Sequence, residues 1–269
     1  MNRYDGIVHP QMIEMNPAHP PQSASHTPAL HPHALHVWRI SLDQPSSLRD
    51  SLQDALSADE RERADRFVFA KDRERFVVAR AALRDIISRY LHVAAGDIRF
   101  EYSEFGKPGL ARLHQSNLQF NLSHSNGVAL LALTLTRRLG IDVEFLRPVN
   151  DFEQIARRFF SANESATLFR LPAAQQPLAF FTCWTRKEAY IKAIGEGLSH
   201  PLEHFDVSLA PDQPAALLAT RPHSLTAGAG YVAALAAEGR DHQLSCWQWQ
   251  PTGIPHRFSI HPPEAHLNR

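Results

Sequence analysis

The chain has 269 residues, and its 28 Lys and Arg balance its 28 Asp and Glu, so the formal net charge is zero. This length suffices for one or two domains, and 43% hydrophobic residues is typical of globular proteins. The charge balance argues against nucleic-acid binding through bulk electrostatics. Two cysteines are too few for a disulfide-built fold. Without a long apolar run or an apolar signal core, we expect a cytoplasmic protein with no membrane or nucleic-acid partner.

The two ends of the chain are expected to lie outside the folded lobes. Residues 1–36 are rich in Pro and His without sustained periodicity, which predicts a poorly ordered lead-in. Its histidines His31, His33 and His36 have no nearby thiol or carboxylate, so no metal site is expected there. Residues 251–269 are similarly irregular and are interpreted as a tail.

The first half between these ends is predicted to begin with two helices. The charged segment 52–70 is helical in composition, and Ser57 followed by Glu60 is typical of a capping box. Apolar residues then recur at helical spacing over 73–91. Short segments rich in apolar and β-branched residues predict the strands that follow, over 98–102, 118–122, 128–136 and 139–145.

The second half repeats this order in part. A helix is predicted over 151–160, a break around Pro172 and Pro177, and a helix over 178–194 that ends near Gly195. Three further strands are predicted, over 204–209, 231–236 and 244–249. Each half thus places a long amphipathic helix before an aromatic strand and a small-residue strand. This order predicts an α+β fold of two similar lobes, 37–137 and 138–250.

Two carboxylates share one face of the strand at 139–145. Ile141, Val143 and Phe145 are expected to face the core, which sends Asp142 and Glu144 to the other side. Two carboxylates that enter one cleft repel each other unless a cation or proton lies between them, and Mg²⁺ prefers oxygen ligands. The alternative is an acidic edge that faces solvent.

Three residues on the helix over 178–194 are spaced four apart. Trp184, Glu188 and Lys192 therefore share one face. Glu188 is a candidate third metal ligand, with Lys192 as the ammonium for a phosphate. The alternative is a routine helix pair worth about 0.3–0.5 kcal/mol.

Two further segments carry polar groups at predicted loops. Ser123 and His124 are not expected to act as nucleophile and base, because adjacent residues of an extended segment face opposite ways and no G-x-S-x-G elbow is present. Contacts to an anion fit them better. Lys107 lies at the centre of a turn over 104–108, a position that is usually only solvated.

Taken together, five segments in this order resemble the 4′-phosphopantetheinyl transferases, in particular their larger, surfactin-synthetase-activating type. The resemblance extends from about Ala58 to Leu209. The matching segments are FGKP (105–108), FNLSHS (120–125), GIDVE (140–144), RRFF (157–160) and WTRKEAYIKAIGEGL (184–198). The resemblance implies a pseudo-dimer of two related α/β lobes with the active site between them, and a monomeric enzyme.

The resemblance also implies an activity and its residues. The enzyme would move 4′-phosphopantetheine from coenzyme A to a serine of an acyl or peptidyl carrier protein and release adenosine 3′,5′-bisphosphate. Fatty acid, polyketide and non-ribosomal peptide (antibiotic) biosynthesis all remain open as the carrier's pathway. The implied roles are Mg²⁺ binding by Asp142, Glu144 and Glu188, general base catalysis by Glu188, protonation or binding of the leaving phosphate by Lys192, and coenzyme A contacts by Arg63, Arg75, Lys107, Pro108, Ser123, His124, Lys187 and Lys192. A carboxylate that holds a cation has a lowered pKa, so a metal-bound water is an alternative base.

Two other functions are compatible with parts of the sequence. The three carboxylates would also suit an unrelated Mg²⁺-dependent phosphohydrolase, although the basic surplus typical of nucleic-acid substrates is absent. The mixed-charge segment 58–85 would suit a helix that docks a partner.

Overall fold

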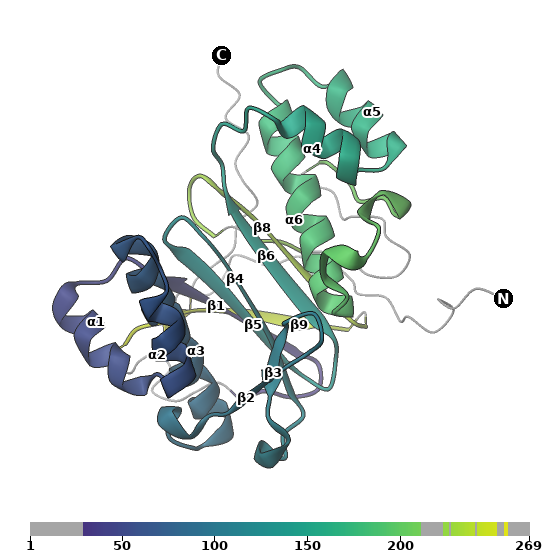
Figure 1. The fold of residues 1–269 in the computed structure, drawn as a ribbon. Helices are drawn as coiled ribbons and strands as arrows, with labels where there is room; N and C mark the ends of the chain where they lie inside the picture. The colour runs from purple at the N-terminus through teal and green to yellow at the C-terminus, as the bar shows by residue number, and fades with distance from the viewer. Residues whose placement is uncertain (1–28, 211–222, 226, 240, 252–255, 258–269) are drawn as a thin grey trace.

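The computed structural model describes residues 29–210, 223–225, 227–239, 241–251 and 256–257 (Figure 1). It is a mixed α/β structure. Its strands are β1 Ala34–Ser41, β2 Phe100–Tyr102, β3 Pro108–Leu110, β4 Leu118–Ser125, β5 Val128–Leu135, β6 Leu139–Phe145, β7 His223–Leu225, β8 Tyr231–Ala237, β9 Gln243–Gln248 and β10 His256–Arg257. Its α-helices are α1 Ser46–Leu52, α2 Ala58–Asp65, α3 Ala70–Leu91, α4 Phe152–Phe159, α5 Ala162–Arg170 and α6 Gln176–Ile194. Short 3₁₀ helices lie at Gln53–Ala55, Ala95–Asp97, Arg112–His114, Gly197–Ser199 and Leu202–His204.

The strands form two packed sheets and a separate pair. The larger sheet has the order β10-β9-β1-β5-β4, the smaller has the order β6-β8-β7, and β2 pairs with β3. Helices α1–α3 lie on one side of the strands and α4–α6 on the other (Figure 1). Across the described residues, we find no helix whose length and apolar run match the thickness of a bilayer.

Two hydrophobic cores lie on opposite faces of the larger sheet. On one face, α3 packs against β1, β4 and β5 through residues such as Trp38 and Leu83. On the other face, Val37 and Leu130 pack against Ile141 and Leu235 of the smaller sheet. Helix α6 covers the outer face of β6 and β8. The layers are therefore helix, sheet, sheet and helix, which places β6 between the larger sheet and α6.

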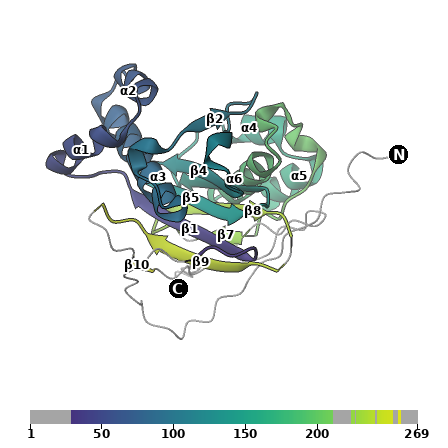
Figure 2. The same ribbon diagram turned by 90° about the horizontal axis from the view of Figure 1, so that it is seen from below.

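The central strand β1 differs from the sequence expectation. It begins at Ala34, inside the predicted lead-in, and His36 is buried with its ring hydrogen-bonded to the Tyr90 hydroxyl at 2.8 Å. Strand β10 likewise lies inside the predicted tail and pairs antiparallel with β9. The lead-in before residue 29 and the tail residues 252–255 and 258–269 lie outside the described residues. Strand β9, which falls within the predicted C-terminal lobe, pairs parallel with β1 (Figure 2). A strand from the second half thus belongs to the sheet of the first half.

Two predicted elements have different structures. The segment 52–70 is broken into the end of α1, a 3₁₀ turn and α2, and its capping box is confirmed by the Ser57 amide, which donates to Glu60 at 3.0 Å. Residues 204–209, predicted as a strand, form none. Their backbone groups bond to helix side chains instead: the Val207 amide donates to Glu164 at 2.6 Å, and the Ser208 carbonyl accepts from Arg186 at 2.6 Å. The second half therefore lacks the aromatic strand, at 204–209, on which the inferred duplication partly rested.

The other main elements agree with the sequence patterns. Helices α3, α4 and α6 and strands β4, β5, β6, β8 and β9 lie at their expected positions, with boundaries that shift by a few residues. Pro177 does not interrupt a helix; it lies in the first turn of α6. Amides of a first turn have no hydrogen-bond partner within the helix, so the missing amide hydrogen of proline costs no helix hydrogen bond there. Helix α5 was not anticipated.

The two sheets are joined by side chains where β4 runs beside β6. Three alternate residues of β4 accept hydrogen bonds from three alternate backbone amides of β6. These are Asn121 from Ile141 at 2.8 Å, Ser123 from Val143 at 3.4 Å and Ser125 from Phe145 at 3.1 Å. We call this set of contacts the β4–β6 seam. It fixes the register of β6 against the edge of the larger sheet.

Candidate active site

A cavity of about 370 Å³ opens where β4, β6 and α6 meet. Three elements that are distant in sequence supply its walls. The lining residues are Leu122, Ser123 and His124 from β4, Asp142 and Glu144 from β6, and Trp184, Glu188 and Lys192 from α6. All three helix residues predicted to share one face do so, and both predicted strand carboxylates reach the same space.

The alternation predicted for residues 141–145 of β6 is confirmed at four of the five. Ile141 and Val143 are buried in the core between the sheets, while Asp142 and Glu144 point to the seam and the cavity. Phe145, also expected in the core, is only partly buried and packs against the Tyr231 ring. Asp142 is itself only 4% exposed, so it is a buried carboxylate and not part of a solvent-facing acidic edge.

Asp142 is paired with Lys192 across the cavity. Lys192 Nζ lies 2.6 Å from Asp142 Oδ1, and the Ser123 hydroxyl donates to the same oxygen at 2.8 Å. Burial raises the pKa of Asp142, and the Lys192 ammonium opposes that rise. The second oxygen, Oδ2, is buried and has no hydrogen-bond partner among the described residues. An unpartnered buried carboxylate oxygen is a position where a cation would be stabilised.

Glu188 is held in the cavity wall by its helix. Burial raises the pKa of Glu188 to about 7, the Lys192 ammonium opposes that rise, and the Asp142 and Glu144 carboxylates add to it. A carboxyl group poised near neutrality is suited to accept a proton. Trp184, one turn earlier, stacks on Phe180 and meets the edge of Phe159 from the RRFF segment. These rings anchor the helix face that carries Glu188.

Glu144 is anchored by one of its two oxygens. Oε2 accepts from the Ser125 hydroxyl at 2.9 Å and from Arg147 at 3.2 Å. Within the described part of the chain, no group of three or more His, Cys, Asp and Glu is arranged as a ready metal site. The donor chemistry nevertheless suits a hard cation, because Asp142, Glu144 and Glu188 offer carboxylate oxygens only and Oδ2 of Asp142 lacks a partner.

A second cavity, of about 280 Å³, adjoins the first through Leu122, Glu188 and Lys192. Lys107 and Pro108 line it, as the resemblance implies. Lys107 Nζ donates to the Leu139 carbonyl at 3.0 Å and to the Lys192 carbonyl at 2.6 Å. Burial lowers the pKa of Lys107 to about 8. Lys107 therefore ties its turn to β6 and α6 and is not a solvated loop residue.

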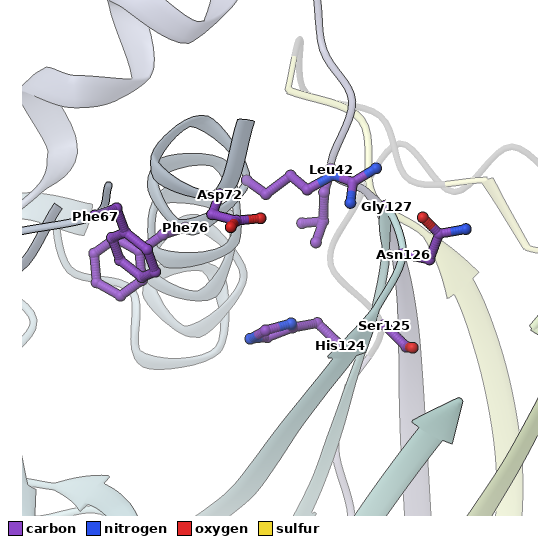
Figure 3. A pocket seen from close by; sticks show the side chains of 9 residues that line it. Leu42, Phe67, Asp72, Phe76, His124, Ser125, Asn126 and Gly127 are labelled. Atoms are coloured by element: carbon purple, nitrogen blue, oxygen red, sulfur yellow. The ribbon is translucent and has the colours of Figure 1, made fainter. Parts of the chain in front are cut away.

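A third cavity, of about 250 Å³, lies on the other side of His124 (Figure 3). Phe67 and Phe76 form one wall, with ring centroids 5.2 Å apart. Arg75 also lines this cavity and binds Asp43 through two hydrogen bonds of 2.8 and 2.9 Å. Burial lowers the pKa of His124, and the Lys192 ammonium lowers it further. His124 lines both this cavity and the first, so the two cavities adjoin at its side chain.

Two of the expected coenzyme A contacts lie elsewhere. Arg63 stacks over the ring of Phe76 at 5.5 Å and is not among the residues that line the three cavities. Lys187 is fully buried. Its Nζ lies 2.8 Å from Glu164 and donates to the carbonyls of Leu202 and Phe205, both at 2.6 Å. A coenzyme A contact does not fit this position of Lys187, because its donors are already used inside the protein.

Sequence reasoning did not single out every residue of the site. Asn121 and Ser125 flank Ser123 at period two within FNLSHS, which is the signal that would have placed all three on one face. Asp43, the partner of Arg75, comes from the segment after β1, and no local pattern connects it with α3.

Comparison with known proteins gives the same family over both halves. A model described as "4′-phosphopantetheinyl transferase, N-terminal" matches residues 43–136, and a model of the 4′-phosphopantetheinyl transferase superfamily matches residues 138–244. The chain is 44% identical to 4′-phosphopantetheinyl transferase HetI of Nostoc sp., over 80% of this chain and 92% of that protein. It is 33% identical to Sfp of Bacillus subtilis, over 70% of this chain and 83% of that protein. The chain belongs to the 4′-phosphopantetheinyl transferase family.

Proposed function

We propose that the protein transfers 4′-phosphopantetheine from coenzyme A to a serine hydroxyl of an acyl or peptidyl carrier protein. The serine oxygen forms a bond to the phosphorus next to the pantetheine, and the bond from that phosphorus to the bridging oxygen breaks. Adenosine 3′,5′-bisphosphate leaves with that oxygen, and the serine proton passes to a base. The observation that carries the proposal is the convergence of Asp142, Glu144, Glu188 and Lys192 in one cavity.

The three adjoining cavities suit an extended substrate. We assign the cavity with Lys107 and Pro108 to the nucleotide, and the one with Arg75 to the 3′-phosphate. Ser123 and His124 lie between them, where their polar groups would contact the phosphates. Arg75 would share its guanidinium between Asp43 and the phosphate, since Asp43 holds it on one side.

We propose Asp142, Glu144 and Glu188 as the residues that would hold Mg²⁺. A bound Mg²⁺ would supply neutralisation of the pyrophosphate charge. The buried, unpartnered Oδ2 of Asp142 supports this assignment.

The proton transfers are assigned to α6. Glu188, which lines the cavity beside Lys192, would accept the proton of the carrier serine. Lys192 lies one turn further along the same face and would donate to the phosphate oxygen that departs. Holding both groups on one helix fixes their separation, which orientation effects in catalysis require.

We further propose a division of the chain into two lobes, together with an oligomeric state and a location. A division into lobes 37–137 and 138–250, related as a pseudo-dimer, is supported by the two family models, which meet between residues 136 and 138. The proposal includes a monomeric enzyme, as the family resemblance implies, located in the cytoplasm and without nucleic-acid or membrane partners. The zero net charge supports the absence of a nucleic-acid partner.

The activity is tested by incubating the protein with coenzyme A, Mg²⁺ and an apo carrier protein. We expect the carrier to gain the mass of one phosphopantetheine and adenosine 3′,5′-bisphosphate to appear in equal amount. Omitting the carrier should stop product formation. Release of adenosine 3′,5′-bisphosphate without a carrier would instead indicate a phosphohydrolase, a function that the comparisons do not support.

A further inference from the structure

We propose that Ser125 is a positioning residue for Glu144, and that its hydroxyl determines which carboxylate oxygen is left to bind a divalent cation. The inference rests on the cation site of the proposed function. Ser125 lines the 250 Å³ cavity and not the 370 Å³ cavity that holds the carboxylates, so it acts on the cation site through Glu144. Binding of a cation without coenzyme A isolates this role.

The backbone fixes the direction of the Ser125 hydrogen bonds. The Phe145 amide donates to Ser125 Oγ at 3.1 Å, so the oxygen acts as an acceptor toward β6. The single hydroxyl proton is then available for Glu144, whose Oε2 accepts it at 2.9 Å. An amide can only donate, so this arrangement holds the hydroxyl with its proton toward the carboxylate.

The same arrangement recurs two residues earlier on both strands. Ser123 Oγ accepts from the Val143 amide at 3.4 Å and donates to Asp142 Oδ1 at 2.8 Å. The seam thus pairs each acidic residue of β6 with one serine of β4. Period-two spacing on both strands makes the two serine–carboxylate contacts alike. They differ in that Lys192 also donates to Ser123, at 3.2 Å, and to Asp142, at 2.6 Å.

In each of the two carboxylates, the serine hydrogen-bonds one oxygen and leaves the other oxygen without a hydrogen bond from it. Oδ2 of Asp142 has no hydrogen-bond partner among the described residues. Oε2 of Glu144 takes both Ser125 and Arg147, and no described residue hydrogen-bonds Oε1. Two adjacent carboxylates, each with one anchored and one free oxygen, form a pair of oriented ligands. Groups that orient metal ligands in this way typically change metal affinity by about 10–100-fold when removed.

The test measures Mn²⁺ binding to the full-length, metal-free protein without coenzyme A, by the electron paramagnetic resonance signal of free Mn²⁺. Ser125→Ala removes the hydroxyl and Ser125→Thr keeps it. Asn121→Ala is the matched control, because it removes another acceptor of the seam, the one for the Ile141 amide, and because Asn121 hydrogen-bonds neither carboxylate. Urea unfolding reports the loss of seam stability in each variant.

We expect Ser125→Ala to weaken Mn²⁺ binding about tenfold or more, while Ser125→Thr and Asn121→Ala stay near the wild type. Both alanine variants should lower the urea midpoint. Equal Mn²⁺ binding by wild type and Ser125→Ala would overturn the inference and leave the cation site standing. Equal weakening in Ser125→Thr or in Asn121→Ala would also overturn it, because the hydroxyl would then not be the cause. A wild-type protein that binds no Mn²⁺ would overturn the proposed cation site, and this inference with it.

Discussion

Gly140 of β6 packs directly against the backbone of α6 at Ala189. A Cβ on Gly140 would lie 2.8 Å from the carbonyl carbon of Lys192, and closer still to the carbonyl oxygen of Ala189 and the amide nitrogen of Ala193. Gly140 precedes Asp142 by two residues, and Ala189 follows Glu188. The absence of a side chain therefore sets how near the carboxylates of β6 come to Glu188.

The first prediction follows from this contact. Gly140→Ala should force α6 away from β6, because the atoms in the way are backbone and cannot move alone. We expect the free energy of unfolding, measured by urea denaturation, to fall by about 1–3 kcal/mol or more. The protein that remains folded should have a lower transfer rate. Gly96→Ala is the control, since no atom lies within 4 Å of a Cβ there. An unchanged Gly140→Ala variant would mean that the two elements pack less closely.

The candidate site was largely predictable because its signals are local. Period two placed Asp142 and Glu144 on one face of β6, and period four placed Trp184, Glu188 and Lys192 on one face of α6. These periodicities depend on backbone geometry alone, so they hold whatever the tertiary context. That the two faces meet was not in the local pattern; it came from the family resemblance.

The parts that escaped prediction depend on distant partners. Strand β1 is buried on both faces and pairs with β5 and with β9, so no amphipathic alternation marked it. Residues 204–209 do alternate, with Val207 and Leu209 buried, but Glu164 and Arg186 capture their backbone groups. A local pattern cannot reveal that a helix side chain will compete for a strand's hydrogen bonds.

The second prediction concerns stability and pH at Glu188. Its pKa in the folded, metal-free protein is about 7, against an ordinary value of 4.5. The folded state therefore holds the proton more tightly, so the contribution of Glu188 to stability is fully present below pH 4.5 and is lost as pH rises through about 7. Glu188→Gln has no carboxyl group to ionise there, so its free energy of unfolding should not fall in this way as pH rises. At pH 8 we expect the variant to be more stable than the wild type, by on the order of 1–3 kcal/mol, in urea denaturation with a chelator present.

The same variant tests the role of Glu188 in transfer. Without the carboxylate, we expect kcat to fall about 10²–10⁴-fold, the usual contribution of a general base, while binding of the carrier protein remains. Single-turnover transfer with saturating carrier separates the two effects. A variant that transfers at the wild-type rate would refute the assignment of Glu188 as base.

The third prediction concerns Lys107, whose ammonium joins the 104–108 turn to β6 and α6. Lys107→Met removes both carbonyl contacts and should loosen the wall of the adjoining cavity. We expect the KM for coenzyme A to rise roughly tenfold, equivalent to about 1.4 kcal/mol, with kcat little changed. Glu104→Gln changes a charge in the same turn and serves as the control. A fall in kcat with constant KM would place Lys107 in the chemical step instead.

The fourth prediction separates a structural role of Lys187 from a coenzyme A contact. Lys187 and Glu164 are 0% and 1% exposed, and Glu164 also accepts from the amides of Ser161 and Val207. Lys187→Met would leave the Glu164 carboxylate buried without its cation, at a cost of about 3–5 kcal/mol. Adding Glu164→Gln should recover part of that loss, because the uncompensated charge disappears. Urea denaturation of the single and double variants measures both effects.

Coenzyme A binding decides between the two roles. If Lys187 acts only inside the fold, folded Lys187→Met protein should bind coenzyme A with nearly wild-type affinity in isothermal titration calorimetry at low temperature. Lys71→Met, the control, alters an exposed lysine and should change the free energy of unfolding by no more than about 0.5 kcal/mol. A large drop in coenzyme A affinity without a matching loss of stability would restore Lys187 to the binding site. The buried position of its ammonium, enclosed by Glu164 and two backbone carbonyls, favours the first result.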